Sequence, residues 1–185
     1  MTEDAFSTAV RELLRHEGGL VDHPADPGGI TRWGISLRFA MGAGDLSGDG
    51  RPDLDVDGDG EVTREDIMAL PLDRAISVYE RVFWHGCRCP EMPAAVAVLV
   101  FDAAVNQGRG PAITLLQRSL RVGDDGRIGP VTLDALRRAA PGPLLADYAA
   151  RRAQRYAATR GFDVFGLGWM RRLAAMHQFA ALTFL

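Results

Sequence analysis

The sequence predicts a mostly helical α+β fold. Apolar residues recur at helical spacing in the first segment of the chain, and helical segments dominate after residue 64. Between them, residues 18–36 are rich in Pro and Gly and carry only short extended pieces, which predict a small β element near the N-terminus. The 185 residues suit one compact domain or two closely joined lobes with a substantial apolar core.

Seven helices are expected from the apolar pattern and from the turn signals between them. Their approximate ranges are 3–16, 64–84, 92–106, 110–121, 130–139, 142–160 and 167–182. In the first helix, Phe6, Val10 and Leu13 share one face at helical spacing. Gly18 and Gly19 are expected to end it, because glycine readily adopts the left-handed conformation that follows a last helical turn.

Glu17 extends the apolar face of this first helix. Its carboxylate is therefore expected to lose hydration, which raises the pKa of an acidic side chain. A raised pKa is what a general acid needs in order to work near neutral pH. The alternative is an ordinary exposed glutamate in a last helical turn.

An Asp/Gly-rich insertion over residues 42–68 matches the spacing of an EF-hand calcium loop. The candidate ligands of a Ca²⁺ ion are Asp55, Asp57, Asp59, Glu61 (through its carbonyl), Thr63 (through a water) and Asp66. Gly60 stands at the sharp turn, and Asp66 replaces the usual bidentate Glu, as in dockerin-type loops. We expect a structural ion that folds the loop and anchors a helix beginning near Arg64. The alternative is a disordered acidic surface loop.

A partial copy of this pattern precedes the loop. It consists of Asp45, Ser47, Asp49, Gly50 and Asp53. Its twelfth residue is Val56, so we expect this copy to lack a closing carboxylate.

Several motifs follow one another in an order that resembles a known enzyme family. They are EGG at 17–19, DPGGITRWGI at 26–35, AISVY at 75–79 with FW at 83–84, FDAAVNQG at 101–108, LQ at 116–117 with DGRIGPVT at 125–132, and GWMRR at 168–172. Together they resemble glycoside hydrolase family 108, N-acetylmuramidases of the lysozyme-like superfamily, with its associated predicted peptidoglycan-binding region. The resemblance covers nearly the whole chain and implies a two-lobed lysozyme-like fold. By it, residues 1–90 form the catalytic lobe and residues 91–185 a helical lobe.

The resemblance also implies a set of catalytic residues. Glu17 matches the family's general acid, Asp26 would position water or stabilise positive charge, and Thr31 would hold the water, as expected for an inverting reaction. Asp22 competes with Asp26 as the second carboxylate. Asp26 also precedes a strong turn signal, so a structural Asx turn is an alternative role for it. Thr31 has the alternative of an ordinary strand residue.

Three further residues are candidates for binding sugar. Trp33 could stack on a sugar ring, although it could equally belong to the core. Asp102 and Asn106 are four residues apart on one helical face, where they could reach sugar hydroxyls. The alternative for this pair is a buried polar network that ties the helix into the core.

Charge is distributed unevenly along the chain. Residues 1–84 hold 17 acidic residues and 8 arginines, whereas residues 85–185 hold 7 and 13. No basic stripe with interleaved aromatic residues occurs, so a nucleic-acid partner is not expected. The apolar runs are shorter than the roughly 20 residues of a spanning helix, so we expect no stable membrane insertion.

The first residues lack a basic and then apolar leader, so we expect synthesis in the cytoplasm without a signal peptide. Access to the cell wall would then require a holin or a dedicated export system. We expect a monomer.

These observations predict an endolysin-like peptidoglycan hydrolase. Its reaction would be cleavage of the β-1,4 bond between N-acetylmuramic acid and N-acetylglucosamine. One alternative is a non-catalytic wall-binding or scaffolding relative, in which calcium shapes a binding surface. A second alternative is a glycosidase that acts on chitin or chitosan.

Overall fold

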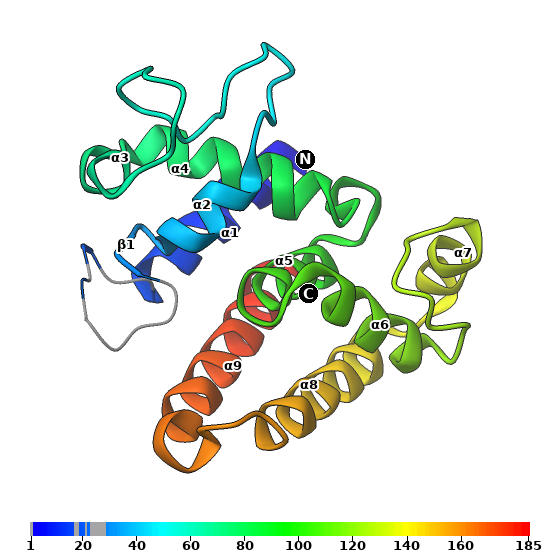
Figure 1. Cartoon of the computed structure of the whole chain (residues 1–185). Helices are drawn as coiled ribbons and strands as arrows, with labels where there is room; N and C mark the ends of the chain where they lie inside the picture. Colours follow the sequence, from blue (N-terminus) through cyan, green and yellow to red (C-terminus); the bar gives the residue numbers. More distant parts are fainter. Residues whose placement is uncertain (1, 17–18, 21, 23–28) are drawn as a thin grey trace. The chain divides into compact units, whose positions relative to one another are not determined.

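The computed structural model describes residues 2–16, 19–20, 22 and 29–185. These residues are mostly helical with one small sheet, as Figure 1 shows, so the predicted mostly helical α+β fold is confirmed. The elements are α1 (Thr2–His16), β1 (Thr31–Arg32), β2 (Ile35–Ser36), α2 (Leu37–Ala43), α3 (Arg64–Ala69), α4 (Leu72–Val78), η1 (Tyr79–His85), η2 (Cys89–Glu91), α5 (Ala94–Gln107), α6 (Arg109–Leu120), α7 (Pro130–Arg138), α8 (Pro141–Ala157) and α9 (Phe162–Phe184).

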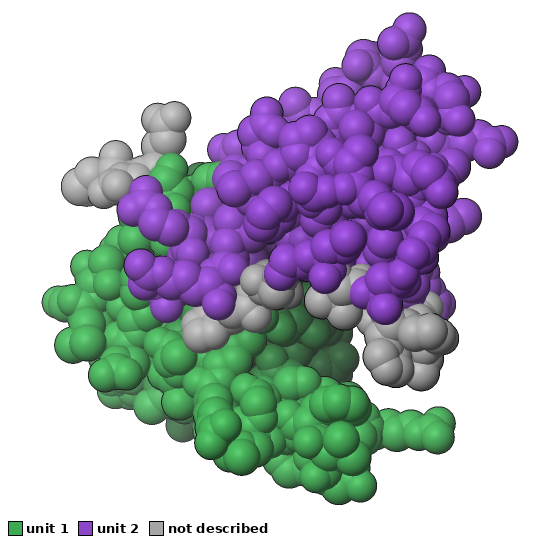
Figure 2. Space-filling model, turned by 90° about the vertical axis from the view of Figure 1, so that its left-hand side faces the viewer, with its two compact units in different colours: residues 1–9, 83–185 green, residues 10–82 purple. Residues whose placement is uncertain are grey.

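The chain divides into two compact units, which Figure 2 shows in different colours. The larger unit combines Met1–Ala9 with Phe83–Leu185, and the smaller unit is Val10–Val82. The functional boundary expected between residues 90 and 91 stays a prediction.

Helix α5 is the centre of the larger unit. Its residues Ala95–Ala104 are all buried, and α6, α8 and α9 pack against it (Figure 1). A helix that is apolar on all sides is stable only when other elements surround it, which explains this central position. The aromatic rings of Phe6, Trp84 and Phe101 meet in the same core, with centroids 5.5–5.9 Å apart. Trp84 is therefore a core residue.

Helix α9 is the longest of the described helices. Only four of its residues are buried, namely Gly166, Leu173, Met176 and Ala180. Nowhere in the described ranges does a helix combine the length and the apolar character needed to cross a membrane.

The smaller unit holds the two-stranded sheet and the short helices α2, α3 and α4. Its buried apolar side chains come from the end of α1, the hairpin region, the acidic insertion and these helices, and they include Val10, Leu13, Ile30, Ile35, Ala40, Leu54, Ile67 and Val78. The insertion is therefore integrated into the core of this unit through Leu54, which is 1% exposed. The helix expected near Arg64 begins at that residue.

The helix expected over residues 64–84 is interrupted, and this part of the prediction is wrong. Pro71 precedes the first residue of α4, and Leu70 before it has an extended ψ of 115°. Proline lacks an N–H and disfavours the helical conformation in the residue before it, so one continuous helix cannot form. Helix α2 was not predicted. Ser36 begins it, because its side-chain oxygen accepts a hydrogen bond from Phe39 N at 3.2 Å.

Candidate active site and acidic loops

A tight β-hairpin positions two of the predicted site residues, Thr31 and Trp33. Strand β1 pairs antiparallel with β2, so that Thr31 lies opposite Ser36 and Arg32 lies opposite Ile35. The two turn residues, Trp33 and Gly34, both have positive φ values, of 53° and 76°. This conformation matches the right-handed twist of the flanking strands, but it is unfavourable for a bulky residue such as tryptophan.

Two long-range hydrogen bonds hold Trp33 in this conformation. Its indole N–H donates to the Leu70 carbonyl at 3.0 Å, and its own carbonyl accepts from the Tyr79 hydroxyl at 2.7 Å. The Arg32 guanidinium lies 5.5 Å from the centre of the indole ring. Strained residues of this kind persist where the surrounding structure fixes them, often at functional sites. Because the ring is only half-buried, it can offer a face to a sugar.

Thr31 is half-buried, and its hydroxyl donates to the Gly29 carbonyl at 3.3 Å. A hydroxyl has one proton to donate and two lone pairs with which to accept. The local bond uses the proton, so the oxygen can still accept a hydrogen bond from a water molecule. This is the property that a water-holding role requires.

The predicted acid and its expected partner lie outside the described residues. These are Glu17 and Asp26. The helix that leads to Glu17 is as predicted, since α1 ends at His16 and its stripe of Phe6, Val10 and Leu13 is buried.

Asp22, the competing second carboxylate, is held by an arginine from the start of α3. Both terminal nitrogens of Arg64 donate to the two oxygens of Asp22, one of them at 3.0 Å. These hydrogen bonds lower the pKa of Asp22. Both oxygens of Asp22 are thus engaged by Arg64.

Asp102 is fully buried and lies between two arginines. Its Oδ2 accepts from Arg152 at 2.6 Å and its Oδ1 accepts from Arg172 at 3.0 Å. Burial by itself would raise the pKa of Asp102, but the charges of Arg152 and Arg172 outweigh burial, and the pKa lies below its usual value. Arg152 is also fully buried, so three helices (α5, α8 and α9) are joined by charge in the core of the larger unit.

Asn106 and Gln107 extend this cluster. The Asn106 amide donates to the Asp102 carbonyl at 2.8 Å and to Asp102 Oδ1 at 3.1 Å. The Gln107 side-chain oxygen accepts from Arg152 Nε at 3.2 Å. This geometry agrees with the alternative of a buried polar network. Asp102 has no exposed surface, whereas Asn106 is half-buried.

The loop that begins at Asp55 brings three predicted calcium ligands together. Carboxylate oxygens of Asp55, Asp57 and Asp59 lie within 4.8 Å of one another. Oxygen ligands surround Ca²⁺ at 2.3–2.6 Å, so two of them can be up to about 5 Å apart, and these three carboxylates fit such an ion. Gly60 has a φ of 97°, a left-handed conformation that only glycine adopts without strain, and its N–H donates to Asp55 at 2.9 Å.

Asp66, the twelfth residue, closes this loop through backbone hydrogen bonds. Its Oδ1 accepts from the N–H groups of Val56 and Asp57 at 2.6 and 3.2 Å. Its Oδ2 accepts from the N–H and the hydroxyl of Thr63 at 2.7 and 2.9 Å, which caps the start of α3. Burial would raise the pKa of Asp66, but these hydrogen bonds lower it overall.

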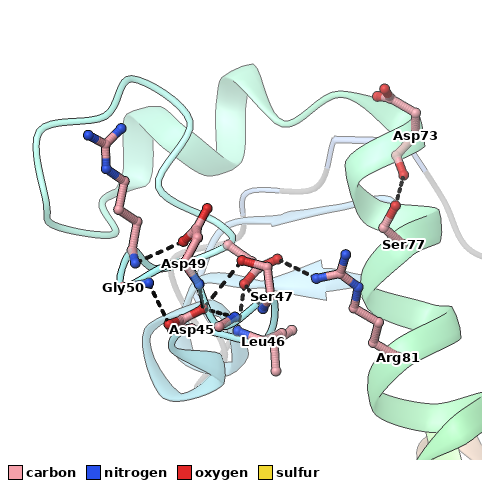
Figure 3. Close-up of polar contacts among 11 residues, drawn as sticks. Asp45, Leu46, Ser47, Asp49, Gly50, Asp73, Ser77 and Arg81 are labelled. Atoms are coloured by element: carbon pink, nitrogen blue, oxygen red, sulfur yellow. Dashed lines mark hydrogen bonds and ion pairs between the residues drawn. The ribbon is translucent and has the colours of Figure 1, made fainter.

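Figure 3 shows polar contacts of the partial copy upstream, whose hydrogen bonds follow the same pattern as those of the loop at Asp55. Asp45 accepts from Gly48 N at 2.6 Å and Gly50 N at 2.8 Å, the same offsets that relate Asp55 to its own two glycines. Asp53 accepts from Leu46 N at 2.5 Å and from Ser47 N at 2.8 Å, as Asp66 does from the second and third residues of its loop. This copy has no carboxylate at its twelfth residue, as expected, and its ninth residue makes the closing hydrogen bonds instead.

Two arginines of the α4–η1 segment hold both loops. Arg81 donates to Asp53 Oδ1 at 3.2 Å (Figure 3), and Arg74 donates to the Asp55 carbonyl at 2.8 Å. They are seven residues apart and so emerge on a similar side of the helical segment. Sequence reasoning missed both, together with Arg64 and Arg152, because each partner is distant in sequence and no local spacing marks it.

In the larger unit, the LQ and DGRIGPVT motifs form one hydrogen-bonded cluster around the buried side chain of Gln117, the Gln117 cluster. The Gln117 amide nitrogen donates to Asp125 at 2.8 Å and to the Arg127 carbonyl at 2.9 Å, and it lies 3.3 Å from the Thr132 hydroxyl. Its amide oxygen accepts from Gly126 N at 2.8 Å. These residues therefore shape the connection between α6 and α7.

The model of the family described as glycosyl hydrolase 108 matches residues 10–108, which is more than half of the chain. The chain belongs to the glycosyl hydrolase 108 family. A model described as a predicted peptidoglycan domain matches residues 111–174. The solved structure of Brucella abortus SagA is similar to this chain, with 29% identity and a TM-score of 0.82, over 98% of this chain and 96% of that one. No curated protein matches the sequence significantly.

These matches make the chain a member of a glycoside hydrolase family, with peptidoglycan as its substrate or partner. The hairpin, the acidic loops and the whole of α5 fall inside the glycosyl hydrolase 108 match. The Gln117 cluster, α7 and α8 fall inside the peptidoglycan domain match. The fold is the α+β, lysozyme-like one that the sequence predicts.

Proposed function

We propose that this protein is an N-acetylmuramidase that cleaves the β-1,4 bond between N-acetylmuramic acid and N-acetylglucosamine in peptidoglycan. The observation that carries the proposal is the glycosyl hydrolase 108 match, followed directly along the chain by the peptidoglycan domain match. The hairpin with Trp33 and Thr31 supports it. Two long-range hydrogen bonds hold this hairpin in place, and a rigid strand element can keep a sugar and a water molecule in fixed positions.

In the proposed mechanism, Glu17 protonates the leaving glycosidic oxygen. Asp26 orients a water molecule or stabilises the oxocarbenium-like centre, and Thr31 accepts a hydrogen bond from that water. Asp22 is the weaker candidate for the second carboxylate, since Arg64 engages both of its oxygens. A water between the two carboxylates attacks the face opposite the leaving group, so the product has inverted configuration.

Trp33 is proposed to stack on a sugar ring, and Asn106 to bind a sugar hydroxyl. Asp102 would then act on the sugar indirectly, because it accepts two hydrogen bonds from Asn106 and so orients its amide. A buried charge cluster can fix one amide rotamer in this way.

A structural Ca²⁺ ion is proposed for the loop of residues 55–66. The carboxylates of Asp55, Asp57 and Asp59, the carbonyl of Glu61 and a water on Thr63 would hold it. The carboxylate of Asp66 would join them by exchanging one of its four hydrogen bonds for the ion. The close approach of the first three carboxylates supports this, since like charges repel without a cation between them. The ion would stiffen the loop and the start of α3.

The proposed site of action is the cell wall, as for an endolysin of phage type, reached through a holin or an export system after synthesis in the cytoplasm. We propose a monomer without a nucleic-acid partner. Peptidoglycan is the partner that the domain match supports.

The test is digestion of purified peptidoglycan by the wild type, by Glu17→Gln and by the matched control Glu65→Gln, with calcium present. Glu65 is an exposed glutamate of α3. We expect new reducing ends of N-acetylmuramic acid from the wild type and the control and a loss of at least about 10³-fold in Glu17→Gln, because a general acid and its position together contribute that much. Proton NMR of the first product should show the α anomer.

Other products would overturn the proposal. Reducing ends from chitin or chitosan, and none from peptidoglycan, would make the protein a different glycosidase. Binding to sacculi without any new reducing ends, in the wild type and in Glu17→Gln alike, would make it a wall-binding protein.

A further inference from the structure

A pocket of about 450 Å³ lies in the larger unit where α6 and α7 end and α8 begins. Figure 1 shows these three helices together. Pockets that hold small ligands have volumes of about 300–1,000 Å³, so this one can take a short peptide segment. All of its lining residues fall between Ser119 and Arg151, inside the peptidoglycan domain match. None of them belongs to the candidate catalytic or sugar-binding residues.

The charged side chains that line this pocket are mostly arginines. Three arginines line it, namely Arg121, Arg138 and Arg151, whereas the only lining carboxylate among the described residues is that of Asp147. Arg151 is already paired with Asp147 at 2.6 Å. Within the described part of the chain, neither Arg121 nor Arg138 forms a close ion pair, although the charge of Arg121 also acts on Asp147. The pocket therefore has two positive charges in excess.

The backbone fixes where one of these arginines stands. Arg121 ends α6 in the left-handed conformation, with a φ of 56°, and its N–H donates to the Arg118 carbonyl at 3.1 Å. The next residue, Val122, donates its N–H to the Gln117 carbonyl at 3.1 Å. These two backbone hydrogen bonds end α6 and fix the point on the backbone from which the Arg121 side chain extends.

Two further features favour an anionic group with a small apolar part. The start of α8 lines the pocket through the N-cap residue Ala140 and through Pro143, and the N-terminal end of a helix has partial positive charge. Val122, Ala135 and Leu144 supply apolar wall between the arginines. A carboxylate that is attached to a short aliphatic chain matches both features, and arginine binds carboxylates in a bidentate manner.

We propose that this pocket binds the stem peptide of peptidoglycan through its free carboxylates. This inference rests on the proposed function, which makes peptidoglycan the substrate. In that polymer the glycan supplies hydroxyls and amides, whereas the stem peptide supplies carboxylates next to alanine methyl groups. Arg121 and Arg138 bind the carboxylates, and the apolar wall contacts the methyl groups.

The experiment measures binding of the isolated peptide L-alanyl-γ-D-glutamyl-meso-diaminopimelyl-D-alanine to the full chain by calorimetry and NMR shift perturbation. The variants are Arg121→Gln, Arg138→Gln and the control Arg137→Gln. Arg137 neighbours Arg138 on α7, but it is outside the pocket and pairs with Asp134. We expect at least tenfold weaker binding in the first two variants, unchanged binding in the control, and weaker binding of the peptide with amidated carboxylates.

Equal binding by all variants, or equal binding of the amidated peptide, would overturn the proposal. Hydrolysis is measured in parallel on intact peptidoglycan and on glycan strands from which an amidase has removed the peptides. Hydrolysis by the wild type without any peptide binding would overturn the pocket proposal alone. Peptide binding through Arg121 and Arg138 without hydrolysis of either polymer would overturn the muramidase proposal alone.

Discussion

Aspartate carboxylates have different kinds of partner in the two compact units. In the larger unit, Asp102 is fully buried, and its charge is compensated by Arg152 and Arg172. In the smaller unit, Asp55 and Asp66 accept hydrogen bonds mainly from the N–H groups of their own loop. Backbone N–H groups satisfy lone pairs but neutralise no charge, so the loop keeps its negative charge available for a cation.

This difference predicts how each region should respond to change. The Asp102 cluster is closed, because its anion has no exposed surface and lies between two arginines of the chain, which give the cluster one positive charge in excess. The acidic loops are open, because their carboxylates are arranged by the backbone and only Asp53 pairs with an arginine among the described residues of the two loops. Mutation should disturb the first region most, and cation concentration should disturb the second.

The largest effect is expected for Asp102→Asn. Removing one partner of a buried ion pair leaves uncompensated charge in the core, which costs about 3–5 kcal/mol. Urea unfolding at neutral pH measures this loss. The matched control is Arg137→Gln, which breaks an exposed pair with Asp134 and should change the free energy of unfolding by about 0–1 kcal/mol.

The pH dependence of Asp102→Asn sharpens this test. The folded pKa of Asp102 lies below its ordinary value of 3.8. The stability that its charge contributes is therefore fully present above that value and is lost as the pH falls through the folded pKa. The difference between wild type and variant should shrink below pH 3.8. A constant difference down to the acid transition would show that packing, and not charge, causes the loss.

The next largest effect is expected from calcium. Saturation of the loop at 100 times the dissociation constant stabilises the native state by about 2.7 kcal/mol, which corresponds to a rise in Tm of about 5–10 °C. Asp57→Asn should abolish the rise, since it removes one of the three clustered carboxylates. Thermal unfolding with calcium, with magnesium and with a chelator measures the effect.

The control for calcium is Asp73→Asn, an acidic residue in the first turn of α4 outside both loops. It should keep the full response. Asp49→Asn separates the two loops, because a reduced response there would place part of the binding in the upstream copy. An unchanged Tm in the wild type, together with no effect of the chelator, contradicts the calcium proposal.

The two regions were also unequally predictable. The residues of the acidic loops are close in sequence, so their spacing alone predicts the register of Asp55, Asp57, Gly60 and Asp66. Arg152 and Asp102 are 50 residues apart, and only the packing of α5 against α8 brings them together. The sequence therefore left two alternatives for Asp102, and the structure favours the buried network.

The distinction between signals that are close in sequence and contacts that are distant in sequence applies to the fold as well. Helix α5 was predicted within two residues of its ends, because a continuous apolar run with flanking Pro93 and Gly108 is a local signal. The break at Pro71 is local too, but the apolar pattern continues across it and conceals it. Trp33 could not be understood locally, since its partners Leu70 and Tyr79 are 37 and 46 residues away.

Gln117→Leu tests the Gln117 cluster, whose central side chain is uncharged. We ask whether its loss of stability on mutation is intermediate between those of the two regions. The substitution keeps the apolar volume but leaves Gly126 N and the Arg127 carbonyl without their side-chain partner. Each unsatisfied group costs about 1–3 kcal/mol when buried, and relaxation toward water reduces this, so we expect a loss of about 1–3 kcal/mol in urea unfolding. The response to calcium should be unchanged.

The smallest effect is expected for Arg81→Gln, which removes the pair with Asp53. The guanidinium is about half exposed, and pairs of this kind contribute about 0–1 kcal/mol. If the backbone and a cation hold the loops, the free energy of unfolding and the calcium response should both change little. Arg74→Gln is the companion variant, since Arg74 binds the Asp55 carbonyl and not a carboxylate. A loss of several kcal/mol in Arg81→Gln, removed by added salt, would make the loops depend on charge pairing as the Asp102 cluster does, and the contrast between the two units would fail.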